Sequence, residues 1–443
     1  MSHKIITLVA ALTALLLYAT GSYIWTAVGL GATLFFFLRF IDALGNRMPI
    51  VELMAMMCSL QWILGPVIEY QKESMHYRYQ MYVEEPLYMG FVVPAILAFW
   101  VGAQRFRQHD SLDELKERVK TLLSFVPNFP YYLIVIGTLA PYAAGFVPSS
   151  LSFAFFLFEN VKYIGALYIL QSEKQNRWLV FYGVMLFLVV TSIASGYFHN
   201  LLLWGVLLST FLVKEWKLSF GAKISMAIFA ILLAISVQSI KQQYRQTAWS
   251  GYGGNKTLLF LSLTLEEWLS GRIFMPSTDS DINVRLNQGW IISAVLQHVP
   301  EIEPYAKGET VEEALVAALL PRFLAPNKKV AGGQENFRRF TGLPIADTTS
   351  MGISMAGEGY ANFGRYGGIL FMLFWGLFVG WFWRIMSRWS HYYPTLLIWS
   401  PILFLQVVKA ETEFAVVLNF LLKASILLFL ALWFIKHQFK IRV

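Results

Sequence analysis

The chain has 443 residues, of which 57% are hydrophobic, 16% aromatic and only 14% charged, and its formal net charge is +8. This is the composition of a polytopic membrane protein rather than of a water-soluble domain. Most of the positive charge lies in short loops between apolar segments, so it does not require a nucleic-acid partner. The single cysteine, Cys58, excludes an intramolecular disulfide.

Apolar segments long enough to cross a bilayer recur along the chain and predict an all-α fold, because unsatisfied backbone groups are costly in lipid. We expect about twelve transmembrane helices, each of about 20 residues. The segments are 5–19, 23–40, 50–68, 86–103, 131–147, 151–170, 178–196, 199–213, 222–240, 368–386, 394–410 and 415–435. The first and the eighth are short, so a count of about ten or eleven stays open.

Lysine and arginine in the connections set the expected orientation, because cytoplasmic loops carry the excess of both residues. With the N-terminus in the cytoplasm, the short outside loops contain only Lys72, Arg78 and Lys409. Both termini are then cytoplasmic. Residues 1–240 form the first nine helices, residues 241–366 form a large external loop domain, and residues 367–443 form the last three helices and the C-terminus.

The cytoplasmic connector at residues 104–125 contains a predicted helix of its own. Ser111 and Glu114 form a capping-box pattern at its start. Leucine and valine side chains then recur at helical spacing from Leu112 to Leu122. This pattern predicts an amphipathic helix that lies on the membrane surface.

The external segment is not typical of a disordered loop, because it contains apolar runs at 258–265, 291–295 and 311–320. A helix is predicted from Glu309 to Leu320, where Pro321 ends it. Apolar runs outside the membrane are expected to lie on the outer leaflet or among the spans. The segment is therefore expected to cover a cavity that opens laterally to lipid.

Basic side chains recur through this segment, and a guanidinium binds phosphate oxygens in a bidentate manner at any physiological pH. Several arginines at a lipid–water boundary suit a lipid-linked diphosphate. The alternative is that each pairs with an acidic residue of the loop or with a phospholipid headgroup. The basic residues are Arg245, Arg272, Arg285, Arg322, Arg338, Arg339, Arg365, Lys241, Lys256, Lys307, Lys328 and Lys329.

A glycine-rich stretch at residues 350–368 leads directly into the tenth predicted span. Glu358 and Asn362 are four residues apart, so on a helix they share one face. The Glu358 carboxylate is suited to orient or deprotonate a sugar hydroxyl. Neutralising a neighbouring arginine is an equally open interpretation.

Two short elements stand out in the external segment. Residues 321–328 read Pro-Arg-Phe-Leu-Ala-Pro-Asn-Lys, and residues 357–364 read Gly-Glu-Gly-Tyr-Ala-Asn-Phe-Gly. They resemble the Pro-Arg-Phe-Leu-Trp-Pro-Asp/Asn-Lys-Pro and Gly-Glu-x-Tyr-x-Asn-Phe-Gly elements of bacterial O-antigen and exopolysaccharide polymerases of the Wzy type. The chain departs from the family at Ala325 and Lys329, and the turn at 195–200 lacks the arginine of many relatives, where His199 is a possible substitute.

The resemblance implies a GT-C-like membrane glycosyltransferase at the outer face of the bacterial inner membrane. It would transfer a growing glycan from undecaprenyl diphosphate to a hydroxyl of the next lipid-linked repeat unit. The activated leaving group needs charge stabilisation and orientation, which preorganised arginines supply. No dense carboxylate or histidine cluster has metal-ligand spacing, so we expect no metal and no cofactor. Expected partners are lipid-linked oligosaccharide and membrane lipids, with a chain-length regulator and a flippase as further candidates.

The predicted roles follow from the resemblance and from the types of residue present. Catalytic roles are assigned to Glu358, Arg322, Arg285 and His298, with Glu358 or His298 as the base for the acceptor hydroxyl. His298 is equally suited to be a packed surface histidine. The further predicted contacts are diphosphate binding by Arg245, Arg272, Lys328 and Arg338, and sugar binding by Tyr360, Asn362 and Trp290.

Charged residues also lie within the predicted spans. Glu159 and Lys162 are three residues apart and predict an internal ion pair rather than a proton relay. Lys423 is placed to reach Glu411, Glu413 or a diphosphate. An O-antigen ligase that delivers glycan to lipid A core shares the carrier and the arginine chemistry. A transporter or flippase is the alternative from a different class, although the chain shows no internal repeat.

Overall fold

The computed structural model describes residues 3–71, 79–106, 110–148, 151–271, 286–319, 333–347 and 349–439. Within these ranges every regular element is a helix, so the predicted all-α class is confirmed. The first eight helical elements are α1 (His3–Ala19), α2 (Ile24–Ala43), α3 (Ile50–Ser59), the π-helix η1 (Leu60–Leu64), α4 (Gly65–Gln71), α5 (Glu85–Gln104), α6 (Leu112–Phe125) and α7 (Phe129–Ala144).

The remaining elements include the segment that was predicted to be external. They are α8 (Ser152–Leu170), α9 (Arg177–Ser195), α10 (His199–Trp216), α11 (Phe220–Trp249), α12 (Lys256–Leu269), α14 (Gly289–His298), α15 (Glu309–Leu319), α16 (Gln334–Thr341), α17 (Ser354–Trp389), the 3₁₀-helix η4 (Leu396–Trp399), α18 (Ser400–Phe404) and α19 (Phe414–Phe439). The helix predicted from Glu309 is present as α15.

Eight helical segments among the described residues are long and apolar enough to cross a membrane, which supports a polytopic membrane protein. They are α2, the continuous segment Ile50–Gln71, α5, α8, α9, α11, α17 and α19. The pair α6 and α7 makes a ninth if a 92° bend between them is accepted within one span. The predicted first span is the shorter apolar helix α1, and the predicted eighth, α10, is outside this set. The count of about twelve is therefore not confirmed.

The predicted span at residues 394–410 is wrong as a continuous helix. The chain forms η4 and then the short helix α18, and it continues in turns as far as Ala410. Pro401 opens α18, and its missing amide cannot donate to the preceding turn, so one helix does not run through both elements. The side chains from Leu396 to Leu405 are buried. This irregular backbone therefore lies within protein, where it is tolerated at membrane depth.

Close contact between glycines and backbone packs α5 against α17. A Cβ added to Gly376 would lie 2.1 Å from the Phe99 carbonyl oxygen, and one added to Gly380 would lie 2.6 Å from that of Ala103. At the other end of the pair, Arg365 donates to the Gly90 carbonyl at 2.9 Å. The contacts advance in the same direction along both helices, so α5 and α17 are parallel.

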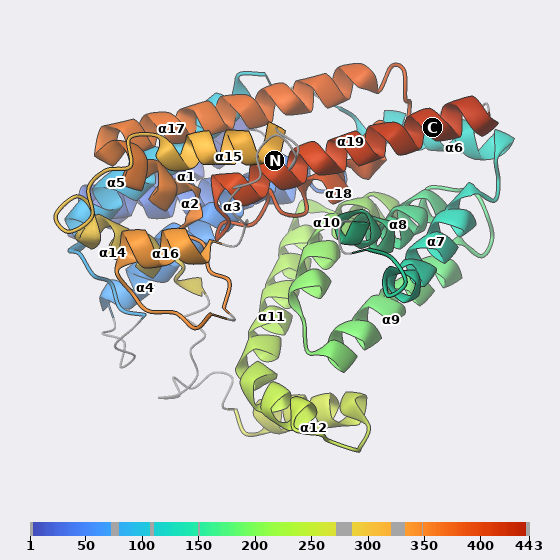
Figure 1. Ribbon diagram of the computed structural model, residues 1–443, viewed down its shortest axis with the longest axis horizontal. Helices are drawn as coiled ribbons and strands as arrows, with labels where there is room; N and C mark the ends of the chain where they lie inside the picture. Colours follow the sequence, from blue (N-terminus) through green and yellow to red (C-terminus); the bar gives the residue numbers. More distant parts are fainter. Residues whose placement is uncertain are drawn as a thin grey trace.

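The last helix, α19, also runs parallel to α17. The Phe414 ring lies 5.8 Å from that of Phe371, and the Phe429 ring lies 5.5 Å from that of Trp389. Figure 1 shows α17 and α19 along the long axis, with α14, α15 and α16 at one end and α6 and the C-terminus at the other. Residues 390–413 must therefore travel back along the bundle between two parallel helices.

The segment that was predicted to be an external domain shares the main hydrophobic core. Trp290, Ile292, Phe337 and Phe340 belong to the same buried cluster as Phe91 of α5. In contrast, α12 packs on a smaller cluster around Phe198, directly before α10, and Tyr244 of α11. Helices α7 to α12 form a second group beside the long bundle (Figure 1).

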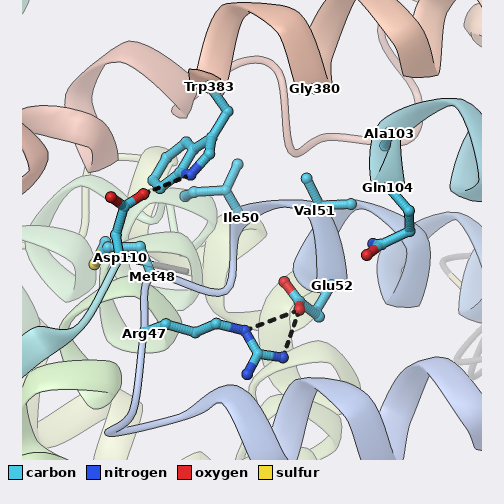
Figure 2. A pocket seen from close by; sticks show the side chains of 10 residues that line it. All are labelled: Arg47, Met48, Ile50, Val51, Glu52, Ala103, Gln104, Asp110, Gly380 and Trp383. Carbon is cyan, nitrogen blue, oxygen red and sulfur yellow. Dashed lines mark hydrogen bonds and ion pairs between the residues drawn. The ribbon is translucent and has the colours of Figure 1, made fainter. Parts of the chain in front are cut away.

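The amphipathic helix predicted after Ser111 is present as α6, with the Ser111 hydroxyl accepting from the Asp113 amide at 3.2 Å. Its apolar face is buried in the protein core. Figure 2 shows the small pocket beside it, where Trp383 donates to Asp110 at 3.0 Å and Arg47 binds Glu52 at 2.9 Å. The pocket holds only about 30 Å³. It is a group of paired polar side chains at this end of the bundle rather than a ligand site.

One intramembrane prediction is confirmed in α8, where the Lys162 ammonium lies 3.4 Å from the Glu159 carboxylate. The Lys162 side chain is 3% exposed and that of Glu159 is 43% exposed. The pair places the buried charge of Lys162 next to a compensating one.

The glycine contacts between α5 and α17 give a test of the fold. Gly376→Ala should lower the midpoint of thermal unfolding in nanodiscs, because the new methyl group forces the two helices apart at a cost of about 1–3 kcal/mol. Gly183→Ala on α9 is the matched control, since its added Cβ meets nothing within 4 Å. An unchanged midpoint for Gly376→Ala would show that this contact does not hold the helices together.

Candidate functional site

The sequence-predicted site residues fall into two sets. Arg272, Arg285, Arg322 and Lys328 lie outside the described residues. Seven are described, namely Glu358, His298, Arg245, Arg338, Tyr360, Asn362 and Trp290.

Glu358 and Asn362 lie on one face of α17, as their spacing predicts, and both contact Thr310 of α15. The Thr310 hydroxyl donates to one Glu358 carboxylate oxygen at 2.7 Å and accepts from the Asn362 amide at 2.7 Å. The other Glu358 oxygen accepts from the Phe414 amide at 2.8 Å. Glu358 is 0% exposed. This network fastens α15 and the start of α19 to α17.

A second buried carboxylate, Glu413, lies directly before α19. One of its oxygens accepts from the Ile353 amide at 3.0 Å and the other from the Asn336 side chain at 3.0 Å. Burial raises the pKa of the Glu413 carboxyl above its ordinary value, and these two hydrogen bonds oppose the rise. Glu413 thus joins α16 and the segment before α17 to the start of α19.

Gly364 makes the arrangement around Glu358 possible by interrupting α17. Its φ of 68° and ψ of −167° lie outside the helical region and suit a glycine. Gly359, before the interruption, packs on Gly368 after it, and an added Cβ at Gly359 would lie 3.3 Å from the Gly368 Cα. The stretch that resembles the polymerase element is therefore a short helix folded back against the spanning part of α17.

The two predicted sugar-binding aromatics are packed against other rings. Tyr360 makes edge contacts with Phe91 at 5.2 Å and with Tyr305 at 6.2 Å between ring centroids. Trp290 makes such contacts with Tyr79 and Phe337. Both side chains are buried in the core.

Among the arginines of the external segment, Arg338 and Arg339 fit the alternative in which loop acids pair with them. Arg338 binds Asp347 at 2.7 Å. Arg339 binds Glu303 at 2.6 Å and Glu309 at 3.0 Å. The hydrogen bonds that the Arg339 guanidinium donates to Glu309 and Glu303 raise its pKa.

Arg245 and His298 occupy separate places. Arg245 donates to the Gly196 carbonyl at 2.9 Å and lies over the Trp249 ring. It therefore brings a guanidinium to the turn at 195–200, which has none in its own sequence. His298 ends α14, and its ring fills the space beside Gly342, where an added Cβ would lie 2.6 Å from the imidazole.

A polar cavity of about 470 Å³ borders these packed residues, with Glu413 on its lining. A polar cavity within an apolar bundle is a candidate functional site, because burying unused polar groups there is costly. Its walls come from η1, α10, α11, α14, the stretches before α16, α17 and α19, and α19 itself. The lining residues are Gln61, His199, Gln238, Lys241, Gln288, Ile291, Gly333, Ser350, Met351, Gly352, Gln406, Lys409, Glu411, Thr412, Glu413 and Val416.

The π-helix η1 fixes one wall of the cavity. A π-helix leaves backbone groups out of the regular ladder and is frequent at functional sites. Here the backbone carbonyl of Gln61 accepts from the backbone amide of Gln288 at 3.1 Å. The backbone carbonyl of Trp62 accepts from the Tyr88 hydroxyl at 2.9 Å. Gly65 lets the backbone at Asn287 lie close against this part of the chain, because a Cβ added to Gly65 would lie 2.6 Å from the Asn287 Cα. The start of α14 is thereby held against η1.

The cavity contains residues that the sequence analysis did not assign to the site. Gln61 was detectable as an amide inside an apolar span, and Lys409 and Glu411 as charges close to the last span. The sequence could not show that these residues meet Gln238 and Gln406. Among the described residues, no group of three or more histidine, cysteine or acidic side chains is placed to hold a metal.

The hydrogen bonds of Glu358 give a test of its role. Glu358→Gln should reduce the free energy of unfolding by about 1–3 kcal/mol and so lower the thermal unfolding midpoint. The reason is that the new side-chain amide cannot accept hydrogen bonds from both Thr310 and Phe414. Glu301→Gln, at an exposed carboxylate, is the control and should leave the midpoint unchanged. Loss of activity with an unchanged midpoint would instead favour a direct chemical role for Glu358.

The raised pKa of Glu413 gives a test by pH. The folded protein binds this proton more tightly than the unfolded chain does, so the group's contribution to stability falls as pH rises above its ordinary value of 4.5. In Glu413→Gln this contribution is absent. The midpoint of the native protein should therefore fall relative to that of the variant as the pH rises above 4.5. Parallel pH profiles would contradict this assignment.

No protein-family model, curated protein or solved structure matches this chain. The two sequence elements and the geometry of the polar cavity are therefore the indications of function in this chain.

Proposed function

We propose that the protein polymerises undecaprenyl-diphosphate-linked oligosaccharide repeat units at the outer face of the bacterial inner membrane. The observation that carries this proposal is the polar cavity of about 470 Å³ within an otherwise apolar helical bundle. Such a cavity suits the water-soluble head of a lipid-linked substrate, while the surrounding bundle suits its hydrocarbon tail.

The arrangement of charges supports the proposed orientation. Lys116 and Arg118 of α6 lie at the end of the bundle where α17 and α19 finish, with Arg388 and Lys436 in the last turns of those two helices. These residues contribute to the positive excess expected on the cytoplasmic side. Because α5, α17 and α19 are parallel and begin at the opposite end, that end, with α14, α15 and α16, faces outward in the proposal (Figure 1).

The proposed reaction breaks the bond between the anomeric carbon of the growing glycan and its diphosphate oxygen. A hydroxyl of the incoming unit forms the new bond and loses its proton to a base. The departing diphosphate carries the developing negative charge, which nearby cations stabilise. In this proposal Arg285 and Arg322 perform their predicted catalytic role by binding the diphosphate. Two described residues at the cavity, Gln288 and Gly333, adjoin in sequence the segments that carry those arginines.

The polymerase proposal is tested by a glycan ladder. Purified protein in nanodiscs should convert lipid-linked repeat units from the native host into a ladder, and EDTA should not abolish it. Arg322→Ala should slow polymerisation by about 10²- to 10³-fold, the effect of losing one preorganised charge-stabilising group. Arg388→Ala, at an exposed arginine at the other end of the bundle, is the control and should retain the ladder.

Units that stay monomeric with a well-folded protein would overturn the polymerase proposal. Transfer of the glycan to an added lipid A core acceptor would then identify a ligase. Movement of intact lipid-linked units between leaflets, without transfer, would identify a flippase.

A further inference from the structure

An apolar groove of about 330 Å³ lies between the last turns of α17 and the middle turns of α19. Its floor comes from the irregular segment between these helices, where Leu396 and Leu403 are buried. At its rim, Trp389 of α17 is 45% exposed and Ile426 of α19 is 58% exposed. A buried floor with an exposed rim makes this a groove that opens sideways from the bundle.

The lining of this groove is apolar along its whole length. The side chains are aliphatic or aromatic apart from Ser425, whose hydroxyl donates to the Leu421 carbonyl at 2.6 Å within α19. A sugar or a diphosphate would lose its hydrogen bonds to water here without gaining new ones, which is costly. An empty groove would leave its lining without contacts on one side. The ligand that suits it is therefore a hydrocarbon chain.

A lysine lies at one end of the groove. Phe429 and Leu432 line the groove, and Lys436 follows on the same face of α19, because the three are spaced by three and four residues. The Lys436 Nζ atom lies 5.3 Å from the centroid of the Tyr393 ring, which also lines the groove. No carboxylate among the described residues pairs with Lys436. This charge complements an anionic group at the end of a hydrocarbon chain.

The spacing along α19 gives the groove the depth of one leaflet. Lys436 follows Ser425 by eleven residues, which is about 16 Å along a helix. Half of the hydrocarbon core of a bilayer is about 15 Å thick. Val416, at the polar cavity, precedes Lys436 by twenty residues, or about 30 Å, the thickness of the whole core. The groove and the polar cavity therefore belong to opposite leaflets.

We propose that the groove holds one acyl chain of an anionic phospholipid, whose phosphate binds Lys436, in the leaflet where α17 and α19 end. Basic positions between spanning helices are favourable sites for anionic headgroups, and Trp389 and Tyr393 are aromatic residues of the kind enriched at that depth. The isoprenoid tail of a lipid-linked substrate is a different occupant. With its head in the polar cavity, such a substrate carries its charge at the opposite membrane surface and brings none to Lys436. Phospholipid binding at this groove does not depend on the polymerase reaction.

The test measures lipid binding to the full-length protein, delipidated in detergent, by native mass spectrometry. The probes are phosphatidylglycerol and phosphatidylcholine with identical acyl chains, so that the lipids differ in headgroup charge. The native protein should bind phosphatidylglycerol more tightly. Lys436→Gln should lower the affinity for phosphatidylglycerol about fivefold, because one basic group near an anionic lipid surface is worth about that factor. Lys436→Arg should retain the native preference.

The acyl chain is tested by filling the groove. Ser425→Phe places a ring there and should weaken the binding of both lipids about tenfold, because the chain loses its packing surface. If this variant does not fold, judged by its thermal unfolding, Ser425→Leu takes its place.

Two controls should bind both lipids as the native protein does. Ser225→Phe on α11 is matched to Ser425→Phe, since this exposed serine also donates to the carbonyl four residues earlier, at Gly221, and does not line the groove. Arg105→Gln, at the exposed arginine directly after α5, controls for general surface charge.

Three results overturn the proposal. They are equal affinity of the native protein for the two lipids, an affinity for phosphatidylglycerol that is unchanged in Lys436→Gln or in folded Ser425→Phe, and an equal loss in either control. Uncharged undecaprenol is the last probe. If an equimolar amount of it displaces phosphatidylglycerol, the groove belongs to an isoprenoid tail and the phospholipid assignment is wrong, whereas retention of phosphatidylglycerol supports it.

Discussion

The close, parallel contact between α5 and α17 is the constraint on which the rest of the structure depends. Glycine at positions such as Gly376 brings the two backbones together, and any larger side chain would separate them. Because α19 joins this parallel set, the chain after α17 must return along the whole bundle before α19 begins. The return ends at Glu411 and Glu413, which therefore meet the π-helix and the start of α14 at the polar cavity.

Hydrogen bonds to buried carboxylates keep that end of the bundle in place. Glu358 and Glu413 each use both oxygens, and their partners lie on α15, on α16, before α17 and at the start of α19. An ionised carboxylate is costly to bury unless it is well bonded, so these contacts specify one arrangement of four segments. Glu413 also lines the polar cavity, together with Gln61 and Gln288. Groups that hold the fold at this end of the bundle therefore form part of the cavity wall.

Local patterns in the sequence predicted the all-α class, eight of the spans, the helix after Ser111, the helix from Glu309 and the ion pair of Glu159 with Lys162. Each depends on residues that are close along the chain. Hydropathy could not separate a helix from buried irregular backbone at residues 394–410, because both are equally apolar. Spacing placed Glu358 and Asn362 on one face but could not show that Thr310 occupies it. The cavity was missed because its amides meet only through tertiary packing.

The irregular segment between α17 and α19 also affects how the chain is inserted into the membrane during synthesis. Residues 394–410 do not form one continuous helix, so in lipid many of their backbone groups would lack partners, at a cost of several kcal/mol for each. Their burial in the finished protein includes contacts with α19, which emerges later from the ribosome. A reporter fused within this stretch would therefore mark the compartment of an unfinished chain. A fusion placed after α19 would report the mature topology.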